Sequence, residues 1–427
     1  MRLRSWRDYQ RYGRRRRIVR RLSAVTGLGL ALLALAGLAA TMRDDRPGAG
    51  GAFLGQPRTA APAVEAAPDP ASEFRLDPSD LAAIEVVDGA AVVALPDGHR
   101  ARLTLDPDLQ ERLEKILARA RPIAGAIVML DPRDGRVLGL ASTARDRALG
   151  VIALRSEFPA ASLFKLVTAA AGLEAGTVTP ATKIYTVGGG LRRLRPEHVR
   201  DNPDRERWVM TMEQALARSN NPVLAKVAVK RVGADRLAAA AEAFAFNRQI
   251  PFELPLGVSR ASVPDDPFGL GKTGAGFGEV TISPLHAALI SAAIANEGHM
   301  PRPWIVESVV DAKGRVVYEA RPEVLVRTMR AQTASALAGM MVDTVTQGTS
   351  RRAFRDSRAA RRGEIAGKTG SLNGNNPRGH YDWFTGFAPV DDPEVAVAAL
   401  LVNGDLWYLK GSGAAREALE AFWQTRR

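Results

Sequence analysis

The chain has 427 residues, 46% of them hydrophobic and 25% charged, so it can form one large or two ordinary domains with an ample core. Its formal charge of +13 is concentrated in residues 1–21, where ten arginines face one aspartate; the other 406 residues carry only +4, which removes the main support for nucleic-acid binding. The absence of cysteine excludes disulfides, thiolate metal sites and a cysteine nucleophile.

Residues 22–42 follow this basic tail as an uncharged stretch rich in Leu, Ala and Gly. A helix of this length can cross about 30 Å of hydrocarbon. The flanking arginines predict a cytoplasmic N-terminus, with the rest of the chain on the periplasmic side of the cytoplasmic membrane. A cleaved signal peptide is the alternative, because small residues lie near the end of the stretch. The length favours an uncleaved single-pass anchor, since a signal peptide has only about 7–15 apolar residues.

Residues 43–74 are rich in Pro, Ala and Gly without apolar periodicity, which predicts a disordered linker. Residues 75–121 predict a small β module followed by a lead-in helix. The segment AIEVVDGAAVVALPDGHRARLTLD alternates in polarity and turns at two Asp-Gly pairs. The segment DPDLQERLEKILARA then has the spacing of an amphipathic helix, with Asp106 as its predicted N-cap.

Residues 122–427 predict a larger domain with strands near both ends. A hairpin is predicted over 124–142, and residues 162–350 are mostly helical in pattern. Three more strands are predicted at 364–371, 382–390 and 394–404, before a closing helix in the last 15 residues. Strand groups so far apart predict an α+β fold, in which about five antiparallel strands form one sheet packed between helices.

Lysine is scarce in this chain, where arginine outnumbers it 50 to 9 among the 59 basic residues. A buried lysine can lose its proton and act as a base, which arginine cannot do. Ser162 and Lys165 are three residues apart at the start of ASLFKLVTAAAGLEAG, so a helix would place both on one face. The pair suggests a serine nucleophile with an amine base, although such a spacing can also arise by chance.

Two further motifs follow. Ser219 and Asn221 could relay a proton and hold an amide carbonyl, although Ser-Asn-Asn is also an ordinary helix N-cap. Lys368-Thr369-Gly370-Ser371 offers a cation, two hydroxyls and a glycine that permits close approach, which suits a substrate carboxylate. The tetrapeptide Gly-Lys-Thr-Gly, which residues 367–370 form, also occurs at 271–274. We expect the second copy to be functional, because it begins a predicted strand.

Together these motifs read S-x-x-K, S-x-N and K-T-G, the signature set of penicillin-binding proteins and serine β-lactamases. The sequence resembles a monofunctional penicillin-binding transpeptidase across roughly residues 103–405, in segments such as AIVMLDPRDGRVLGLAS, ALARSNNPVLAKVA and GFGEVTISPLHAALISAAIANEG. The resemblance implies the α+β fold of that superfamily. It also implies crosslinking of peptidoglycan stem peptides that end in D-Ala-D-Ala, with β-lactams as covalent inhibitors.

The resemblance also implies a role for each matching residue. Ser162 would be the acylated nucleophile and Lys165 its base, Ser219 would pass the proton to the leaving amine, and Asn221 would hold Lys165 and the substrate amide. Lys368 would polarise Ser219.

Thr369 and Ser371 would bind the terminal carboxylate beside Gly370, and the backbone N–H groups of Ser162 and Ser371 would form the oxyanion hole. No cofactor or metal is implied, and a membrane glycan polymerase is left open as a partner. A D,D-carboxypeptidase, a serine β-lactamase and a non-turnover β-lactam sensor or scaffold remain as alternatives.

Overall fold

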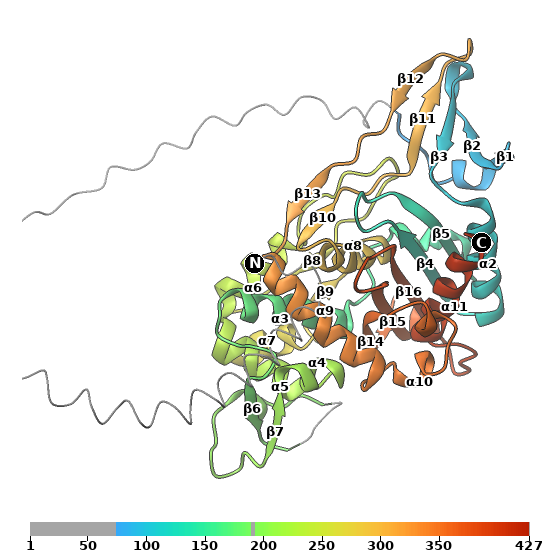
Figure 1. The fold of residues 1–427 in the computed structure, drawn as a ribbon. Helices are drawn as coiled ribbons and strands as arrows, with labels where there is room; N and C mark the ends of the chain where they lie inside the picture. Colours follow the sequence, from blue (N-terminus) through green and yellow to red (C-terminus); the bar gives the residue numbers. More distant parts are fainter. Residues whose placement is uncertain (1–73, 189–192, 427) are drawn as a thin grey trace, which may run out of the picture. The chain divides into compact units, whose positions relative to one another are not determined.

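The computed structural model describes residues 74–188 and 193–426 (Figure 1). The predicted tail, anchor and linker therefore lie outside the described residues, except for Phe74 at the linker's end. Within the described ranges, no helix combines the length and the apolar character needed to cross a membrane. The described elements belong to one unit, residues 71–427.

The central element is a five-stranded antiparallel sheet with the strand order β14-β15-β16-β4-β5. Its strands are β4 (Ala124–Leu130), β5 (Val137–Ala144), β14 (Ala366–Asn375), β15 (Arg378–Ala388) and β16 (Val395–Asn403). The predicted N-terminal hairpin and the predicted C-terminal strands thus meet in one sheet, in which β4 pairs with β16. The predicted α+β fold with about five antiparallel strands is confirmed.

Both faces of this sheet are covered. On β4, Ala126 and Val128 belong to the larger core, where helix α8 (Pro284–Ala295) contacts β4, β15 and β16. The intervening Ile127 and Met129 belong to a second core, formed with helices α2 (Pro107–Ala120) and α11 (Gly411–Gln424). Successive side chains of a strand point to opposite faces. Two buried faces therefore explain why these strands read as continuous apolar runs rather than as alternating ones.

The helices lie mainly between the two strand groups of the sequence. They are α2 (Pro107–Ala120), α3 (Lys165–Glu174), α4 (Met212–Ala217), α5 (Asn221–Val227), α6 (Ala234–Ala243), α7 (Pro267–Gly274), α8 (Pro284–Ala295), α9 (Ala331–Thr346), α10 (Arg351–Phe354) and α11 (Gly411–Gln424). The predicted cap of α2 is present, since Asp106 accepts a hydrogen bond of 3.0 Å from the backbone N–H of Leu109. The predicted closing helix corresponds to α11.

A second five-stranded sheet has the order β1-β2-β3-β11-β12. The predicted β module supplies β1 (Glu85–Val87), β2 (Ala90–Ala94) and β3 (Arg100–Leu103). The other two strands, β11 (Val306–Val310) and β12 (Val316–Glu319), come from the stretch predicted to be mostly helical, and β11 pairs antiparallel with β3 (Figure 1). That stretch also contains β6 (Lys183–Thr186), β7 (Trp208–Thr211), β8 (Arg260–Ala261), β9 (Val280–Thr281), β10 (His299–Pro301) and β13 (Val324–Arg327).

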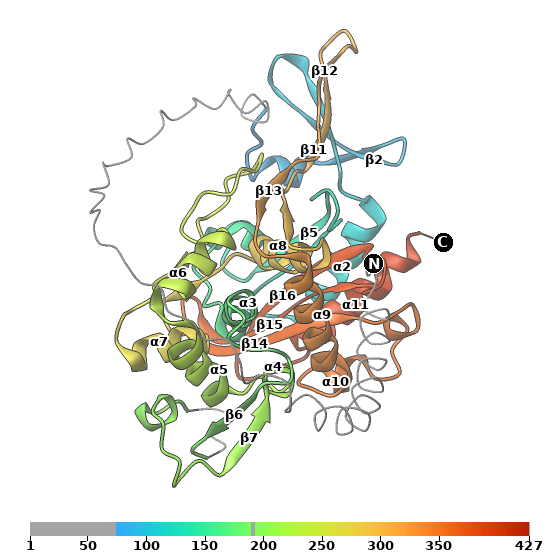
Figure 2. The same ribbon diagram turned by 60° about the vertical axis from the view of Figure 1, so that its left-hand side comes forward.

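The three sequence motifs come together at the edge strand β14. Figure 2 shows α3, α4 and α5 gathered beside the β14–β15 part of the sheet. Helix α9 and the short 3₁₀ turn Ala161–Phe164 also contact β14. Because β14 pairs with only one neighbour, its other side is open toward these helices.

Candidate active site

Ser162 and Lys165 are brought into direct contact by a 3₁₀ turn. The structure places Ser162 in the 3₁₀ turn Ala161–Phe164, whereas the sequence suggested a continuous α-helix; α3 begins only at Lys165. Side chains at positions i and i+3 eclipse one another in 3₁₀ geometry. Lys165 Nζ accordingly lies 2.6 Å from Ser162 Oγ. The turn starts at Ala161, whose φ of 49° is left-handed and whose carbonyl packs closely against Gly276.

Ser219 and Asn221 lie at the junction of α4 and α5. Ser219 has a φ of 55°, and Asn220 caps α5 by accepting a hydrogen bond of 3.0 Å from the backbone N–H of Val223. The capping role suggested for this motif therefore belongs to Asn220. Asn221 is the first residue of α5, and its Oδ1 accepts a hydrogen bond of 2.6 Å from Lys165 Nζ.

Lys368 completes this group from strand β14. Its Nζ donates to Ser219 Oγ over 2.9 Å, and Ser219 Oγ lies 3.4 Å from Lys165 Nζ. Ser219 thus bridges the two lysines. A Cβ at Gly370 would lie 3.1 Å from Trp383 Cβ, which is tighter than an ordinary contact, so Gly370 permits close packing against Trp383 of the paired strand.

The duplicated Gly-Lys-Thr-Gly sequence at 271–274 lies elsewhere, at the end of α7. Lys272 is exposed there and sits 5.9 Å from the ring of Phe268. Lys368, by contrast, is fully buried in a strand. The structure therefore brings only the second copy to Ser162.

Burial controls the charge of both lysines. Lys165 and Lys368 each have 0% exposure. Removing an ammonium group from water disfavours its charged form, so burial holds the pKa of Lys165 well below 10.5, and the nearby Lys368 cation lowers that pKa further. Burial likewise lowers the pKa of Lys368 to about 7. Among the described residues, the hydrogen-bond partners of both lysines are hydroxyl, amide and carbonyl oxygens, without a carboxylate.

Thr369 and Ser371 lie further along the same strand. Ser371 is exposed, and the Thr369 hydroxyl lies 2.5 Å from that of Thr349. The backbone N–H of Thr349 in turn donates to the carbonyl of Ala217, the last residue of α4. Sequence reasoning assigned no role to Thr349, which ties Thr369 to the helix that leads to Ser219.

Two residues of β15 were also missed as neighbours of the site. Trp383 Nε1 donates to the carbonyl of Pro159 over 3.0 Å and so anchors the segment that leads to Ser162. His380 is half-buried, and its Nε2 lies 2.7 Å from Ser371 Oγ. The predicted strands 364–371 and 382–390 did not reach Asn373 and His380, whereas β14 and β15 extend further toward their turn and place residues 371–373 opposite 380–382.

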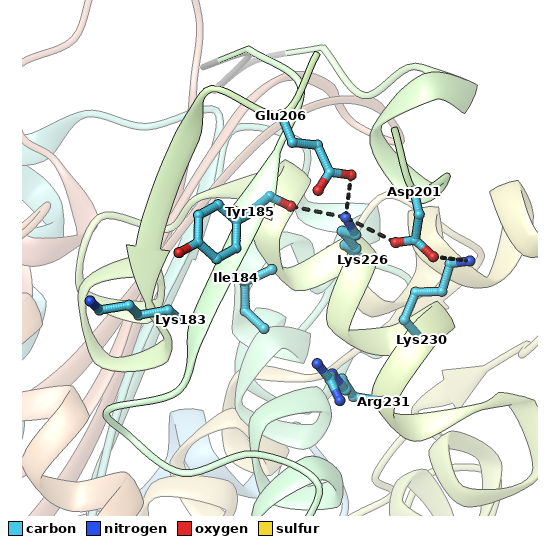
Figure 3. Close-up of a pocket in the computed structure, with 8 residues that line it drawn as sticks. All are labelled: Lys183, Ile184, Tyr185, Asp201, Glu206, Lys226, Lys230 and Arg231. Carbon is cyan, nitrogen blue, oxygen red and sulfur yellow. Dashed lines mark hydrogen bonds and ion pairs between the residues drawn. The ribbon is translucent and has the colours of Figure 1, made fainter. Parts of the chain in front are cut away.

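A separate polar cavity of about 400 Å³ lies between β6 and α5 (Figure 3). Lys226 is buried in its wall, where its Nζ contacts Glu206 at 2.5 Å, Asp201 at 3.1 Å and the carbonyl of Tyr185 at 3.0 Å. Lys230 shares Asp201 at 2.8 Å. These ion pairs connect the end of α5 to the β6–β7 region, and they show a buried lysine with carboxylate partners, unlike Lys165.

The arrangement around Ser162 is suited to serine acyl transfer. A neutral Lys165 amine could take the Ser162 proton, and Ser219 is placed to exchange a proton with either lysine. Lys368 and the hydroxyls of Thr369 and Ser371 offer donors to an anion beside the nucleophile. Within the described part of the chain, no group of three or more histidine, aspartate or glutamate side chains could hold a metal ion.

Comparisons with known proteins agree on one family. Residues 125–422 match the family described as penicillin binding protein transpeptidase domain. The peptidoglycan D,D-transpeptidase PbpA of Mycolicibacterium smegmatis is 28% identical over 351 residues, which cover 72% of this chain and 68% of that protein. The peptidoglycan D,D-transpeptidase MrdA of Haemophilus influenzae is 26% identical over 382 residues, covering 77% of this chain and 57% of that protein.

Solved structures are similar in fold. The D,D-transpeptidase domain of a peptidoglycan glycosyltransferase from Eggerthella lenta has a TM-score of 0.66 and 25% identity, covering 79% of this chain and 96% of that one. The ceftriaxone acyl-enzyme complex of penicillin-binding protein A from Mycobacterium tuberculosis has a TM-score of 0.65 and 27% identity, covering 76% of this chain and 80% of that one. The chain therefore belongs to the penicillin-binding protein transpeptidase domain family.

Proposed function

We propose that this protein is a peptidoglycan D,D-transpeptidase that crosslinks stem peptides through a serine acyl-enzyme. The observation that carries the proposal is the 2.6 Å contact between Ser162 Oγ and the fully buried Nζ of Lys165. A buried amine without a carboxylate partner is deprotonated more easily than an exposed one, and a neutral amine at this distance activates the hydroxyl.

In the first half-reaction, Ser162 Oγ attacks the carbonyl carbon of the penultimate D-alanine, and its proton passes to Lys165. The C–N bond then breaks, and the terminal D-alanine leaves after its amine has received a proton through Ser219. Ser219 suits this role because it lies within 3.4 Å of Lys165 Nζ and 2.9 Å of Lys368 Nζ. In the second half-reaction, the amine of another stem peptide attacks the ester and releases Ser162.

Substrate positioning is assigned to the remaining motif residues. Lys368, Thr369 and Ser371 bind the terminal carboxylate, and Gly370, which lacks a side chain, permits the substrate to lie close to β14. Asn221 holds Lys165 and the substrate amide. The backbone N–H groups of Ser162 and Ser371 stabilise the oxyanion.

The comparisons support this substrate class. PbpA and MrdA are described as peptidoglycan D,D-transpeptidases, and penicillin-binding protein A of Mycobacterium tuberculosis has been solved as acyl-enzyme complexes with ceftriaxone, imipenem and penicillin G. We expect the same β-lactams to acylate Ser162 of this chain.

We expect the full-length protein to form a penicillin adduct that persists for hours in intact mass spectra, and Ser162→Ala to form none. Failure of the wild type to form an adduct would contradict the covalent mechanism. Rapid loss of the adduct would favour a β-lactamase. A persistent adduct together with exchange of the terminal D-alanine of a model peptide for another D-amino acid supports a transpeptidase, whereas release of D-alanine without exchange supports a carboxypeptidase.

We further propose that residues 22–42 anchor the protein in the cytoplasmic membrane by a single helix, with residues 1–21 in the cytoplasm and the transpeptidase domain on the periplasmic side. The uncharged stretch behind ten arginines supports this orientation. The protein should then remain in the membrane fraction after a high-salt wash, with the mass of the uncleaved chain. Mature protein that lacks residues 1–42 in the soluble fraction would instead establish a cleaved signal peptide.

A further inference from the structure

Ser371, which we propose as a ligand of the substrate carboxylate, is hydrogen-bonded to another side chain of the protein. Its Oγ lies 2.7 Å from His380 Nε2, and His380 Nδ1 lies 2.7 Å from Asn373 Oδ1. The pairing of β14 with β15 sets up this chain, because Asn373 is opposite His380 and Ser371 lies two residues along the same strand. The three side chains therefore share one face of the hairpin.

The imidazole of His380 is held from its other side by the loop after β16. The ring of Trp407 stacks on it with centroids 4.2 Å apart and an interplanar angle of 26°. Lys410 Nζ lies 5.7 Å from the centre of the Trp407 ring. This stacking restricts the rotation of the imidazole, so that its two nitrogens stay directed at Ser371 and Asn373.

The partners of His380 determine the direction of each hydrogen bond. Asn373 Oδ1 can only accept, so Nδ1 carries a proton and donates to it. In the neutral ring Nε2 is then an acceptor, and it must receive the hydroxyl proton of Ser371. A Ser371 proton that is committed to His380 cannot be donated to a substrate carboxylate. In the protonated ring Nε2 donates to Ser371 Oγ instead, which leaves the hydroxyl proton for the substrate.

We propose that His380 is a positioning residue that sets the hydrogen-bond direction of the Ser371 hydroxyl, and that its protonated form favours ligands with a terminal carboxylate. This inference rests on the proposed function, because it assigns Ser371 to carboxylate binding. Protonation acts twice in the same sense: it releases a hydroxyl donor and it adds a positive charge near the anion.

Other charged groups surround His380. Arg378 and Asp382 lie two residues away on the same face of β15, and the covering loop contributes Asp405 and Lys410. Asp382 Oδ1 accepts a hydrogen bond of 3.1 Å from the backbone N–H of Gly411. Burial lowers the pKa of His380 below its usual 6.5, and the Lys410 cation lowers it further. The protonated form therefore predominates only at a pH below 6.5.

The test measures the second-order rate constant of acylation between pH 5 and pH 8 for benzylpenicillin and for its carboxamide, in which the carboxylate is replaced by a neutral amide. Their ratio at each pH removes the contribution of Lys165, which activates Ser162 equally for both. Dividing the wild-type ratio by that of His380→Gln then removes the contribution of Lys368, which is present in both proteins.

Glutamine can donate from Nε2 to Ser371 at every pH, so it reproduces the donor of the protonated ring without titrating. We expect the wild-type preference for benzylpenicillin, relative to that of His380→Gln, to rise about tenfold from pH 8 to pH 5, as for one charge-assisted hydrogen bond. His380→Phe keeps an aromatic partner for Trp407 but removes both the acceptor of the Ser371 proton and the titrating group, so its preference relative to that of His380→Gln should not change with pH. Ser371→Ala should reduce the rise, because only the added positive charge of the protonated ring remains.

A relative preference that stays within about twofold across this range while adducts still form would overturn the role of His380 and leave the proposed function intact. No adduct with either compound at any pH would instead contradict the proposed function, and with it the basis of this inference. Far-ultraviolet circular dichroism of the variants identifies any loss of activity that is caused by unfolding.

Discussion

Replacing Lys165 by arginine is expected to reduce the rate constant of acylation by penicillin on the order of 10³-fold, as for loss of a general base. Lys165 is fully buried, and burial holds its pKa well below 10.5, which makes a neutral amine accessible 2.6 Å from Ser162 Oγ. Arginine keeps its proton in proteins and therefore cannot accept one from Ser162. The rate is measured by stopped-flow or quenched-flow formation of a fluorescent penicillin adduct.

Lys272→Arg is the matched control, because Lys272 is the exposed lysine of the duplicated Gly-Lys-Thr-Gly sequence. It should acylate at the wild-type rate. Lys165→Met, which is smaller than arginine and uncharged, separates the loss of the base from strain in the buried site and should be equally slow. Acylation of a folded Lys165→Arg protein within about tenfold of the wild-type rate, well below the effect of losing a general base, would rule out Lys165 as the base.

The scarcity of lysine drew attention to the lysines of the site, but it could not show which of the nine lysines belong to it. Among the described residues, Lys165, Lys226 and Lys368 are the buried lysines. Lys226 has two carboxylate partners, Asp201 and Glu206, whereas Lys165 and Lys368 have none. This difference depends on which distant segments pack against each lysine. It cannot be seen in the residues next to them in the sequence.

The strands of the central sheet were predicted well because turn residues and apolar runs identify them within a few residues of sequence. The hairpin formed by β4 and β5 has a turn that contains Asp, Pro and Gly, and β15 and β16 are largely buried strands. Short connections join β14 to β15 and β15 to β16. Strands β11 and β12 were missed because they are short and incompletely buried. Strand β11 pairs with β3, which lies about 200 residues earlier, and β12 pairs with β11. Such pairing leaves little trace in local sequence.

The candidate site was predicted by motif and completed by tertiary contacts. The eclipsed geometry of Ser162 and Lys165 follows from the turn that begins at Ala161 with a left-handed φ. A left-handed φ is rare for alanine and therefore could not be predicted from the sequence. Likewise, the cap at Asn220 explains why the following residue, Asn221, is the one that contacts Lys165. His380 could have been identified as a neighbour of Ser371 only by pairing the full lengths of the two strands in its hairpin.

Replacing Lys368 by methionine is expected to reduce the rate constant of acylation on the order of 10²-fold, as for loss of one preorganised donor, and to change the shape of its pH profile. The second-order rate constant reports the ionisation of the free enzyme. In the wild type the rate should rise with pH as Lys165 loses its proton and fall as Lys368 loses its own, because burial lowers the pKa of Lys368 to about 7.

Without Lys368 both limbs of this profile should move. The falling limb disappears, because the group that loses its charge near pH 7 is gone. The rising limb shifts to higher pH: burial still lowers the pKa of Lys165, but the neighbouring cation that lowers it further has been removed. Lys272→Met, made in the exposed copy of the motif, should keep the wild-type profile. A Lys368→Met profile with both limbs unchanged would show that the charge of Lys368 neither produces the falling limb nor lowers the pKa of Lys165.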